Sequence, residues 1–255
     1  MQYGNGHNAL GLDASDYQGL ITWSNVRKAN KTWSMIKAAY GHNITDAMFA
    51  TNWHGAQKAG LVVGAYHYVT PQTSDAQTQA AYFLAIVNRE GGIQGGNLPP
   101  VMDLEECGTM TDAALRDWAV AYCNDLDAAI KNPDQRTMVY SYPSFIADHP
   151  LTFGALADRL LWIASYNPSG APPNVGPWKL WTAWQYGDNG HVAGILNAVD
   201  LDEWHTDPSG LIHVTTPPPM SAEVTTLQTQ LAAAQAEITR LNHVVAAIQG
   251  DLKGV

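Results

Sequence analysis

The sequence predicts an α/β fold in which a mostly parallel barrel is followed by a C-terminal α-helical coiled coil. Three observations support this prediction: strands and helices alternate through the first half of the chain, strands dominate the second half, and a regular apolar repeat occupies residues 222–255. With 255 residues, 46% of them hydrophobic, the chain is long enough to bury a full core.

The first half contains apolar strands that are each followed by a helix signal. A short apolar run ends at Asp13, and a helix begins near Trp23 with Ser24 or Asn25 as its cap. Residues 61–69 are continuously apolar, which is typical of a strand buried on both faces of a parallel sheet. We expect further strands at residues 34–40 and 101–104, and helices at 46–59, 74–89 and 111–131, capped by Gly60 and Thr111.

The second half contains strands with no clear helices between them. We expect these strands at residues 137–142, 160–166, 180–186 and 198–201, the last ending in Asp200. Polar and aromatic side chains repeatedly fall at strand ends, and in a barrel those ends meet at one mouth. Four acids that are distant in sequence are therefore expected to meet there, namely Asp13, Asp103, Glu105 and Asp200.

The stretch Leu98–Glu106 carries the clearest chemical signal. Asp103 and Glu105 are two positions apart at the end of a short strand, so their side chains are expected on the same face. Two carboxyl groups in one small space cannot both ionise easily, and a raised pKa suits a general acid. Cleavage of glycosidic bonds needs such a pair. The alternative is that Asp-x-Glu is an ordinary loop start or helix cap.

Composition excludes several functions. The net charge is -10, and the 13 basic residues form no cluster, so we predict no nucleic-acid partner. No apolar run is long enough to span a membrane, and the N-terminal residues do not resemble a secretory signal. We therefore expect synthesis in a host cytoplasm and later release. We expect no metal or cofactor, since Cys107 and Cys123 have no zinc spacing; they form a disulfide or remain buried thiols.

Together, several motifs resemble the bacterial and phage muramidases of glycoside hydrolase family 25. They follow the family's order between residues 10 and 205, and they are Gly11–Gly19, Ile36–Ala38, Ala56–Leu61, Gly64–Tyr68, Met102–Glu105, Trp184–Tyr186 and Val199–Asp200. The resemblance implies a modified TIM-like (β/α) barrel with helices missing in the second half. It also implies hydrolysis of the β-1,4 bond between N-acetylmuramic acid and N-acetylglucosamine in peptidoglycan.

The resemblance also implies roles for individual residues. Glu105 resembles the general acid, and Asp103 its partner, which either stabilises developing positive charge or orients the substrate's N-acetyl group as an internal nucleophile. Asp13 and Asp200 would complete the acidic floor. The residues expected to contact sugar, with core packing as the alternative for each, are Tyr66, Tyr142, Tyr166 and Gln185.

Two further positions deserve comment on the same grounds. The family commonly has Thr-Glu-Gly after Ile36–Ala38, whereas this chain has Ala39-Tyr40-Gly41, so no role is carried over for that acid. His67 lies in an apolar strand, and we expect it to make a structural hydrogen bond.

The predicted domains are a catalytic barrel (1–213), a proline-rich linker (214–221) and an oligomerisation helix (222–255). Apolar residues of the last segment recur at alternating spacings of three and four, from Val224 to Leu252. This repeat predicts a homo-oligomer with increased avidity for a repetitive cell wall. A single amphipathic helix that folds back on the barrel would show the same pattern.

The sequence thus favours a lysozyme that lyses bacterial cell walls, and we expect a phage endolysin. The first alternative is a non-catalytic, multivalent wall-binding or virion structural module, and the second is a glycosidase acting on chitin-like polymers. The four acids argue against a binding module, because a binder has no need of clustered acids that repel one another.

Overall fold

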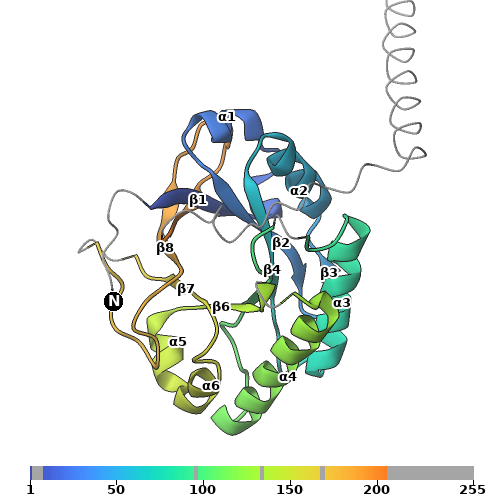
Figure 1. Ribbon diagram of the computed structural model, residues 1–255, viewed down its shortest axis with the longest axis vertical. Helices are drawn as coiled ribbons and strands as arrows, with labels where there is room; N and C mark the ends of the chain where they lie inside the picture. The colour runs from blue at the N-terminus through green and yellow to red at the C-terminus, as the bar shows by residue number, and fades with distance from the viewer. Residues whose placement is uncertain (2–7, 95–96, 133–134, 167–169, 206–255) are drawn as a thin grey trace, which may run out of the picture. The chain divides into compact units, whose positions relative to one another are not determined.

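The computed structural model describes residues 1, 8–94, 97–132, 135–166 and 170–205, and in this part of the chain eight strands close into a barrel (Figure 1). Around the barrel the strands are β1 (Ala9–Ala14), β2 (Trp33–Tyr40), β4 (Val62–Tyr68), β5 (Val101–Asp103), β6 (Met138–Ser141), β7 (Leu161–Ala164), β8 (Ala183–Gly190) and β9 (Val199–Trp204). The predicted linker (214–221) and coiled coil (222–255) lie outside the described residues.

The barrel is mostly parallel. Strands β1, β2, β4, β5, β6, β7 and β8 pair in parallel, whereas β9 is antiparallel to both of its neighbours, β1 and β8. A two-residue strand, β3 (Ile44–Thr45), pairs with the end of β2. The predicted modified α/β barrel is therefore confirmed, and its modification includes a reversed last strand.

Helices cover the first half of the barrel far more than the second. The first four are α1 (Trp23–Lys28), α2 (Phe49–Lys58), α3 (Ala76–Arg89) and α4 (Asp112–Ile130). Thr111 caps α4 as predicted, because its side chain accepts a hydrogen bond from the Ala114 backbone N–H. Gly60, predicted to end the second helix, has φ of +81°, a conformation that favours glycine.

The prediction of missing helices needs one refinement. Two six-residue helices, α5 (Pro143–Asp148) and α6 (Pro150–Ala155), lie between β6 and β7 (Figure 1). Each begins with a proline at its first turn, where proline is tolerated. Helices shorter than two turns give almost no periodic signal in a sequence. Beyond α6, the described residues form no α-helix.

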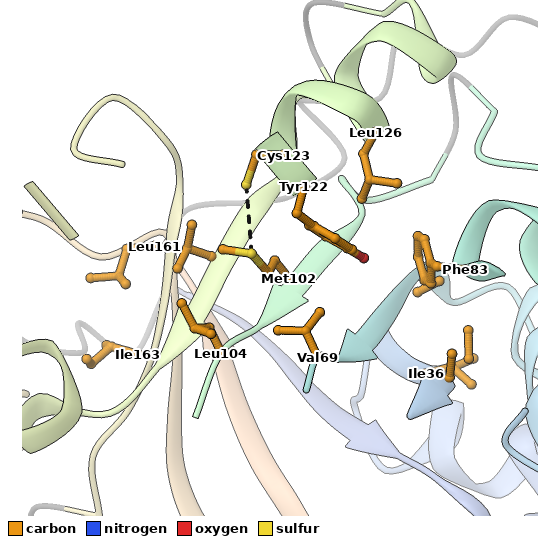
Figure 2. Close-up of a cluster of buried hydrophobic side chains, with 14 of the residues drawn as sticks. Ile36, Val69, Phe83, Met102, Leu104, Tyr122, Cys123, Leu126, Leu161 and Ile163 are labelled. Atoms are coloured by element: carbon orange, nitrogen blue, oxygen red, sulfur yellow. Dashed lines mark hydrogen bonds between the residues drawn. The ribbon is translucent and has the colours of Figure 1, made fainter. Parts of the chain in front are cut away.

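One apolar core lies between the barrel and its outer helices. Met102 and Leu104 point toward the inner face of α4, which contributes Tyr122, Cys123 and Leu126 (Figure 2). Cys123 is fully buried, and its Sγ lies 4.0 Å from Met102 Sδ. Both cysteines are free, so Cys107 and Cys123 are two separate thiols and do not form a disulfide.

A second core fills the barrel itself. Trp33, Trp162 and Trp204 are buried there, and the rings of Trp33 and Trp204 meet edge to face at 5.4 Å. Gly11 on β1 is needed for this packing, because a Cβ atom at that position would overlap the Trp33 ring. The barrel interior around these tryptophans is therefore packed with side chains and is not a pore.

His67 makes the predicted structural hydrogen bonds. Its Nε2–H donates to the Gly41 carbonyl at 2.7 Å, and its Nδ1 accepts from the Tyr122 hydroxyl at 2.8 Å. Burial lowers the pKa of His67 to about 4, so the ring is neutral near pH 7. In the described part of the chain, no helix is both long and apolar enough to cross a bilayer.

Candidate active site

Side chains that face the barrel interior change from apolar to polar toward one mouth. On β2 the inward row begins with Trp33 and reaches Lys37, and on β1 it reaches Asp13. Strand β9 runs the opposite way, so Asp200 precedes Trp204. All of these polar side chains consequently gather at the same mouth.

A cleft opens at this mouth, and all eight residues predicted for the site line it. Its centre is a cavity of about 230 Å³. A neighbouring hollow adds Tyr142 and Tyr166, and another on the opposite side adds Tyr17 and Asp188. The central cavity is lined by Asp13, Lys37, Tyr66, Tyr68, Asp103, Glu105, Tyr140, Trp162, Gln185 and Asp200. Because the three hollows share lining residues, they form an extended cleft that fits a polymer better than a single small molecule.

The first carboxyl pair consists of Asp103, the last residue of β5, and Glu105 in the loop that follows. Asp103 is 4% exposed and Glu105 is half-buried. The two carboxyl groups are close enough to act on each other directly, and a single proton between them would join them. Burial raises the pKa of both groups, and the charge of Glu105 raises that of Asp103 further. The pair therefore retains a proton at pH values where ordinary carboxyl groups have lost theirs.

Lys37 is the cation beside this pair. Its Nζ lies 5.6 Å from the centre of the Tyr40 ring and 5.4 Å from that of Tyr68, and the two rings stack at 4.8 Å. Such contacts stabilise an ammonium group over aromatic faces. Tyr40, where the family commonly has an acid, thus provides an aromatic contact for Lys37. The Lys37 charge partly offsets the raised pKa values of Asp103 and Glu105.

The second carboxyl pair consists of Asp13 on β1 and Asp202 on β9. Both are buried, Asp202 completely. Trp162 Nε1 donates to Asp202 Oδ1 at 2.8 Å, and Gln185 Nε2 donates to Asp13 Oδ2 at 2.7 Å. Burial raises the pKa of Asp202 to about 8. Burial, followed by the charges of Asp202 and Asp200, raises the pKa of Asp13 well above its usual value.

Gln185 lies on the floor of the cleft. The residue is 2% exposed. Its Oε1 accepts hydrogen bonds from the hydroxyls of Tyr140 and Tyr166, both at 2.9 Å, while its Nε2 donates to Asp13. Gln185 therefore connects the second carboxyl pair to two tyrosines, of which Tyr166 is 51% exposed at the rim.

Tyr66 both packs in the barrel core and lines the cleft. Its ring is buried in the barrel interior and meets Trp162 edge to face at 6.1 Å. The same side chain lines the cleft between Asp13 and Asp103. Tyr142 is half-buried, lines the hollow next to Glu105, and packs against Phe145 with ring centres 5.8 Å apart.

Asp200 lines the cleft together with Asp13. It is directly opposite Asp13 in the pairing of β1 with β9. Burial raises its pKa to about 6, and the charges of Asp188 and Glu105 contribute to this shift. Among the described residues, no group of three His, Cys, Asp or Glu side chains has the geometry to hold a metal ion.

Several residues in or directly behind the cleft were not predicted. Asp202 had a signal, because Asp200-Leu-Asp202 repeats the alternation of Asp103-Leu-Glu105. Tyr140 also had one, since it is two positions before Tyr142 and shares its face. Trp162 had none, because a tryptophan within an apolar strand is indistinguishable from a core residue until its N–H partner is known.

A carboxyl pair with raised pKa values, placed at the mouth of a barrel over an extended cleft, defines a glycosidase type of site. The chain matches the model of the glycosyl hydrolases family 25 over residues 12–195. It is 32% identical to Lysozyme M1 of Streptomyces globisporus over 212 residues, which span 79% of this chain and 69% of that protein.

Other relatives agree with this match. The chain is 26% identical to N,O-diacetylmuramidase of Chalaropsis sp over 202 residues, 74% of this chain and 93% of that protein. A bacterial lysozyme structure from Streptomyces coelicolor superposes with a TM-score of 0.72 at 28% identity, covering 82% of this chain and 97% of that one. The chain belongs to glycoside hydrolase family 25, and it is a glycoside hydrolase.

Proposed function

We propose that this enzyme is an N-acetylmuramidase, a lysozyme that cleaves the β-1,4 bond between N-acetylmuramic acid and N-acetylglucosamine in peptidoglycan. The observation that carries the proposal is the adjacent pair of Asp103 and Glu105, two carboxyl groups with raised pKa values at the centre of an extended cleft. Family membership and the similarity to lysozymes and an N,O-diacetylmuramidase support this substrate.

Glu105 is the general acid of the proposed reaction. It lines both the central cavity and the neighbouring hollow at Tyr142, so it reaches the cleft on two sides, whereas Asp103 lies almost fully buried behind it. Glu105 delivers the proton of the pair to the oxygen of the leaving sugar as the glycosidic C–O bond breaks. Asp103 then carries the negative charge of the pair, which stabilises positive charge on the sugar ring.

The decisive experiment replaces Glu105 by glutamine. Because glutamine cannot donate the proton, we expect the release of reducing ends from purified cell walls to fall by roughly 10²- to 10⁴-fold. Co-sedimentation with walls should persist. Glu106→Gln is the matched control, since Glu106 is the adjacent, half-buried acid that does not line the cleft, and it should remain active. Unchanged wall clearing by Glu105→Gln would contradict the assignment.

Product analysis separates a muramidase from other glycosidases. Reduction of the new ends followed by hydrolysis should yield reduced muramic acid. Reduced glucosamine as the main product would indicate the other bond of the polymer, and cleavage of chitin fragments without wall clearing would favour a chitin-like substrate. A protein that binds walls but releases no reducing ends would favour the non-catalytic module.

Residues 222–255 are proposed to multimerise the enzyme and raise its avidity for the wall. Their heptad pattern supports this role. Sedimentation velocity of the full chain and of residues 1–221 tests it: the full chain should be oligomeric and the truncated one monomeric. Identical monomers would contradict the proposal.

Release as a phage endolysin is also proposed, on the resemblance of the motifs to phage muramidases. In this scheme the enzyme accumulates in the host cytoplasm and reaches the wall through membrane pores made by another protein. Host cells that express the chain should remain intact until their membrane is permeabilised and then lyse. Lysis without permeabilisation would argue for a different route to the wall.

A further inference from the structure

Asp202 is a buried acid that has no role in the reaction described above. It faces the barrel interior on β9, and it does not line the cleft. Strand pairing places it opposite Gln185 of β8 and opposite Gly11 of β1. Asp13 is two residues beyond Gly11, so it is the diagonal neighbour of Asp202 on the same face. The register alone therefore brings Asp202, Gln185 and Asp13 together.

The hydrogen bonds of Asp202 leave one oxygen for Asp13. Its Oδ1 accepts from Trp162 Nε1 at 2.8 Å. Its Oδ2 is buried, and in the described part of the chain it has no hydrogen-bond donor other than the Asp13 carboxyl group. Two ionised carboxylates cannot hydrogen-bond to each other, and two adjacent buried negative charges would be costly. A proton between Asp13 and Asp202 would remove both costs.

We propose that Asp202 is a positioning residue whose carboxyl group shares a proton with Asp13, fixes the orientation of the Asp13 carboxyl, and keeps the pair from carrying two negative charges. The Asp13 carboxyl, which lines the cleft, is then held from two sides, by Gln185 Nε2 and by Asp202. The consequence for catalysis depends on the proposed muramidase reaction, whereas the shared proton does not.

The surroundings of Asp202 favour retention of the proton. The charged and titratable groups that act on it or face it are Asp13 on β1, Asp200 and Glu203 on β9, Tyr186 on β8 and Lys31 before β2. Lys31 is the only cation among these groups, and burial lowers its own pKa. The pKa of Asp202 is raised to about 8, with burial as the largest cause.

The shared proton should make the folding stability depend on pH in a direction that unfolding measurements can detect. In the unfolded chain an aspartate loses its proton near pH 4, whereas the folded protein retains it until about pH 8. Between these values the native state binds more protons, so its stability falls as pH rises. Asp202→Asn removes this effect while it preserves the shape, the acceptor for Trp162 and a donor to Asp13.

The first test compares urea unfolding of the wild type and Asp202→Asn from pH 4 to pH 8. The stability of the variant relative to the wild type should rise with pH, with a slope of about one proton or more. Contributions of other buried groups such as His67 are common to both proteins and cancel in the difference. Asp125→Asn, on the outer helix α4, is the control and should show no slope. Parallel curves for the wild type and Asp202→Asn would overturn the proposal.

The second test measures cell-wall hydrolysis by Asp202→Ala and Asp202→Asn. Loss of the donor should lower kcat of the alanine variant by roughly 10- to 100-fold with a smaller change in KM, because a misplaced cleft group impairs the reaction step. The asparagine variant should recover most of this loss. Full activity of Asp202→Ala, or an equal loss in both folded variants, would overturn the proposal. If the wild type proves inactive on walls, the proposed function fails, and the stability slope still decides the shared proton.

Discussion

The two carboxyl pairs at the barrel mouth are assembled in opposite ways. Asp103 and Glu105 are two residues apart, come from a single strand end, and include one acid open to the cleft. Asp13 and Asp202 come from the two ends of the barrel sequence, and both are buried, with Gln185 as a donor to Asp13 and Trp162 as a donor to Asp202. The comparison indicates that the first pair delivers a proton, whereas the second pair holds one in place.

The largest difference in activity between the two pairs should appear when the more buried aspartate of each pair is replaced by asparagine. Asp103→Asn removes the negative charge that stabilises positive charge on the sugar ring after Glu105 has given up the proton. We therefore expect the rate of wall hydrolysis to fall by roughly 10²- to 10³-fold. Asp202→Asn should cost far less, because its pair needs a donor and not a charge. Initial rates of reducing-end release at matched protein concentration give both values. Equal losses would mean that the two pairs do not differ in this way.

A smaller loss of activity is expected when the hydrogen bonds of Gln185, which connect Asp13 to Tyr166 at the rim, are removed. Gln185→Leu removes the donor to Asp13 and the acceptor for the hydroxyls of Tyr140 and Tyr166, and it leaves three polar groups, two of them buried, with one partner fewer. We expect a loss of roughly 10- to 100-fold in kcat/KM and a lower thermal midpoint. Tyr166→Phe, which removes one of these hydrogen bonds, is the control and should lose less. Full activity of Gln185→Leu would show that the floor does not position Asp13.

At the first pair, a change in the alkaline side of the pH–activity profile is expected. The Lys37 ammonium lowers the pKa values of Asp103 and Glu105, so Lys37→Met should raise both. Because Glu105 must be protonated to act, the alkaline side of the kcat/KM profile should move to higher pH. Lys37→Arg retains the charge and should leave the profile in place. A shift to lower pH would contradict the role of Glu105 as the acid.

The smallest change in the pH–activity profile is expected at Asp200, which is opposite Asp13 in the pairing of β1 with β9. The charge of Asp188 helps to raise the pKa of Asp200 to about 6, so Asp188→Asn should lower that pKa. If the reaction needs ionised Asp200, the acidic side of the activity profile moves to lower pH, by less than about one unit for an exposed charge. The pH profile of Asp125→Asn provides the baseline. An unchanged acidic side would show that Asp200 does not control it.

Prediction from sequence worked well where the signal was local. The alternation of strands and helices, the cap at Thr111 and the pair of Asp103 and Glu105 are each visible within a few residues. The short helices α5 and α6 were missed because fewer than two turns carry no period. The convergence of strand ends in a barrel extended the prediction to Asp13 and Asp200, and the family motifs agreed with it.

Asp200 shows how a correct placement can rest on a wrong strand direction. The sequence predicts a strand over residues 198–201 that ends at Asp200, whereas β9 begins at Val199 and runs to Trp204. Since β9 is antiparallel to its neighbours, its beginning lies at the mouth where the parallel strands end. The direction of a last strand depends on its partners, and a short apolar run does not encode them.

The sequence by itself determined the fold class, the family and the acid pair on β5, because these depend on local periodicity, strand ends and motif order. Only the tertiary structure decided that Asp13 shares a proton with Asp202, that Gln185 lies on the floor, and that Lys37 is held over Tyr40 and Tyr68. The physical reason is that a shared proton and a raised pKa depend on burial and on neighbours from other strands, and these exist only after the barrel has closed.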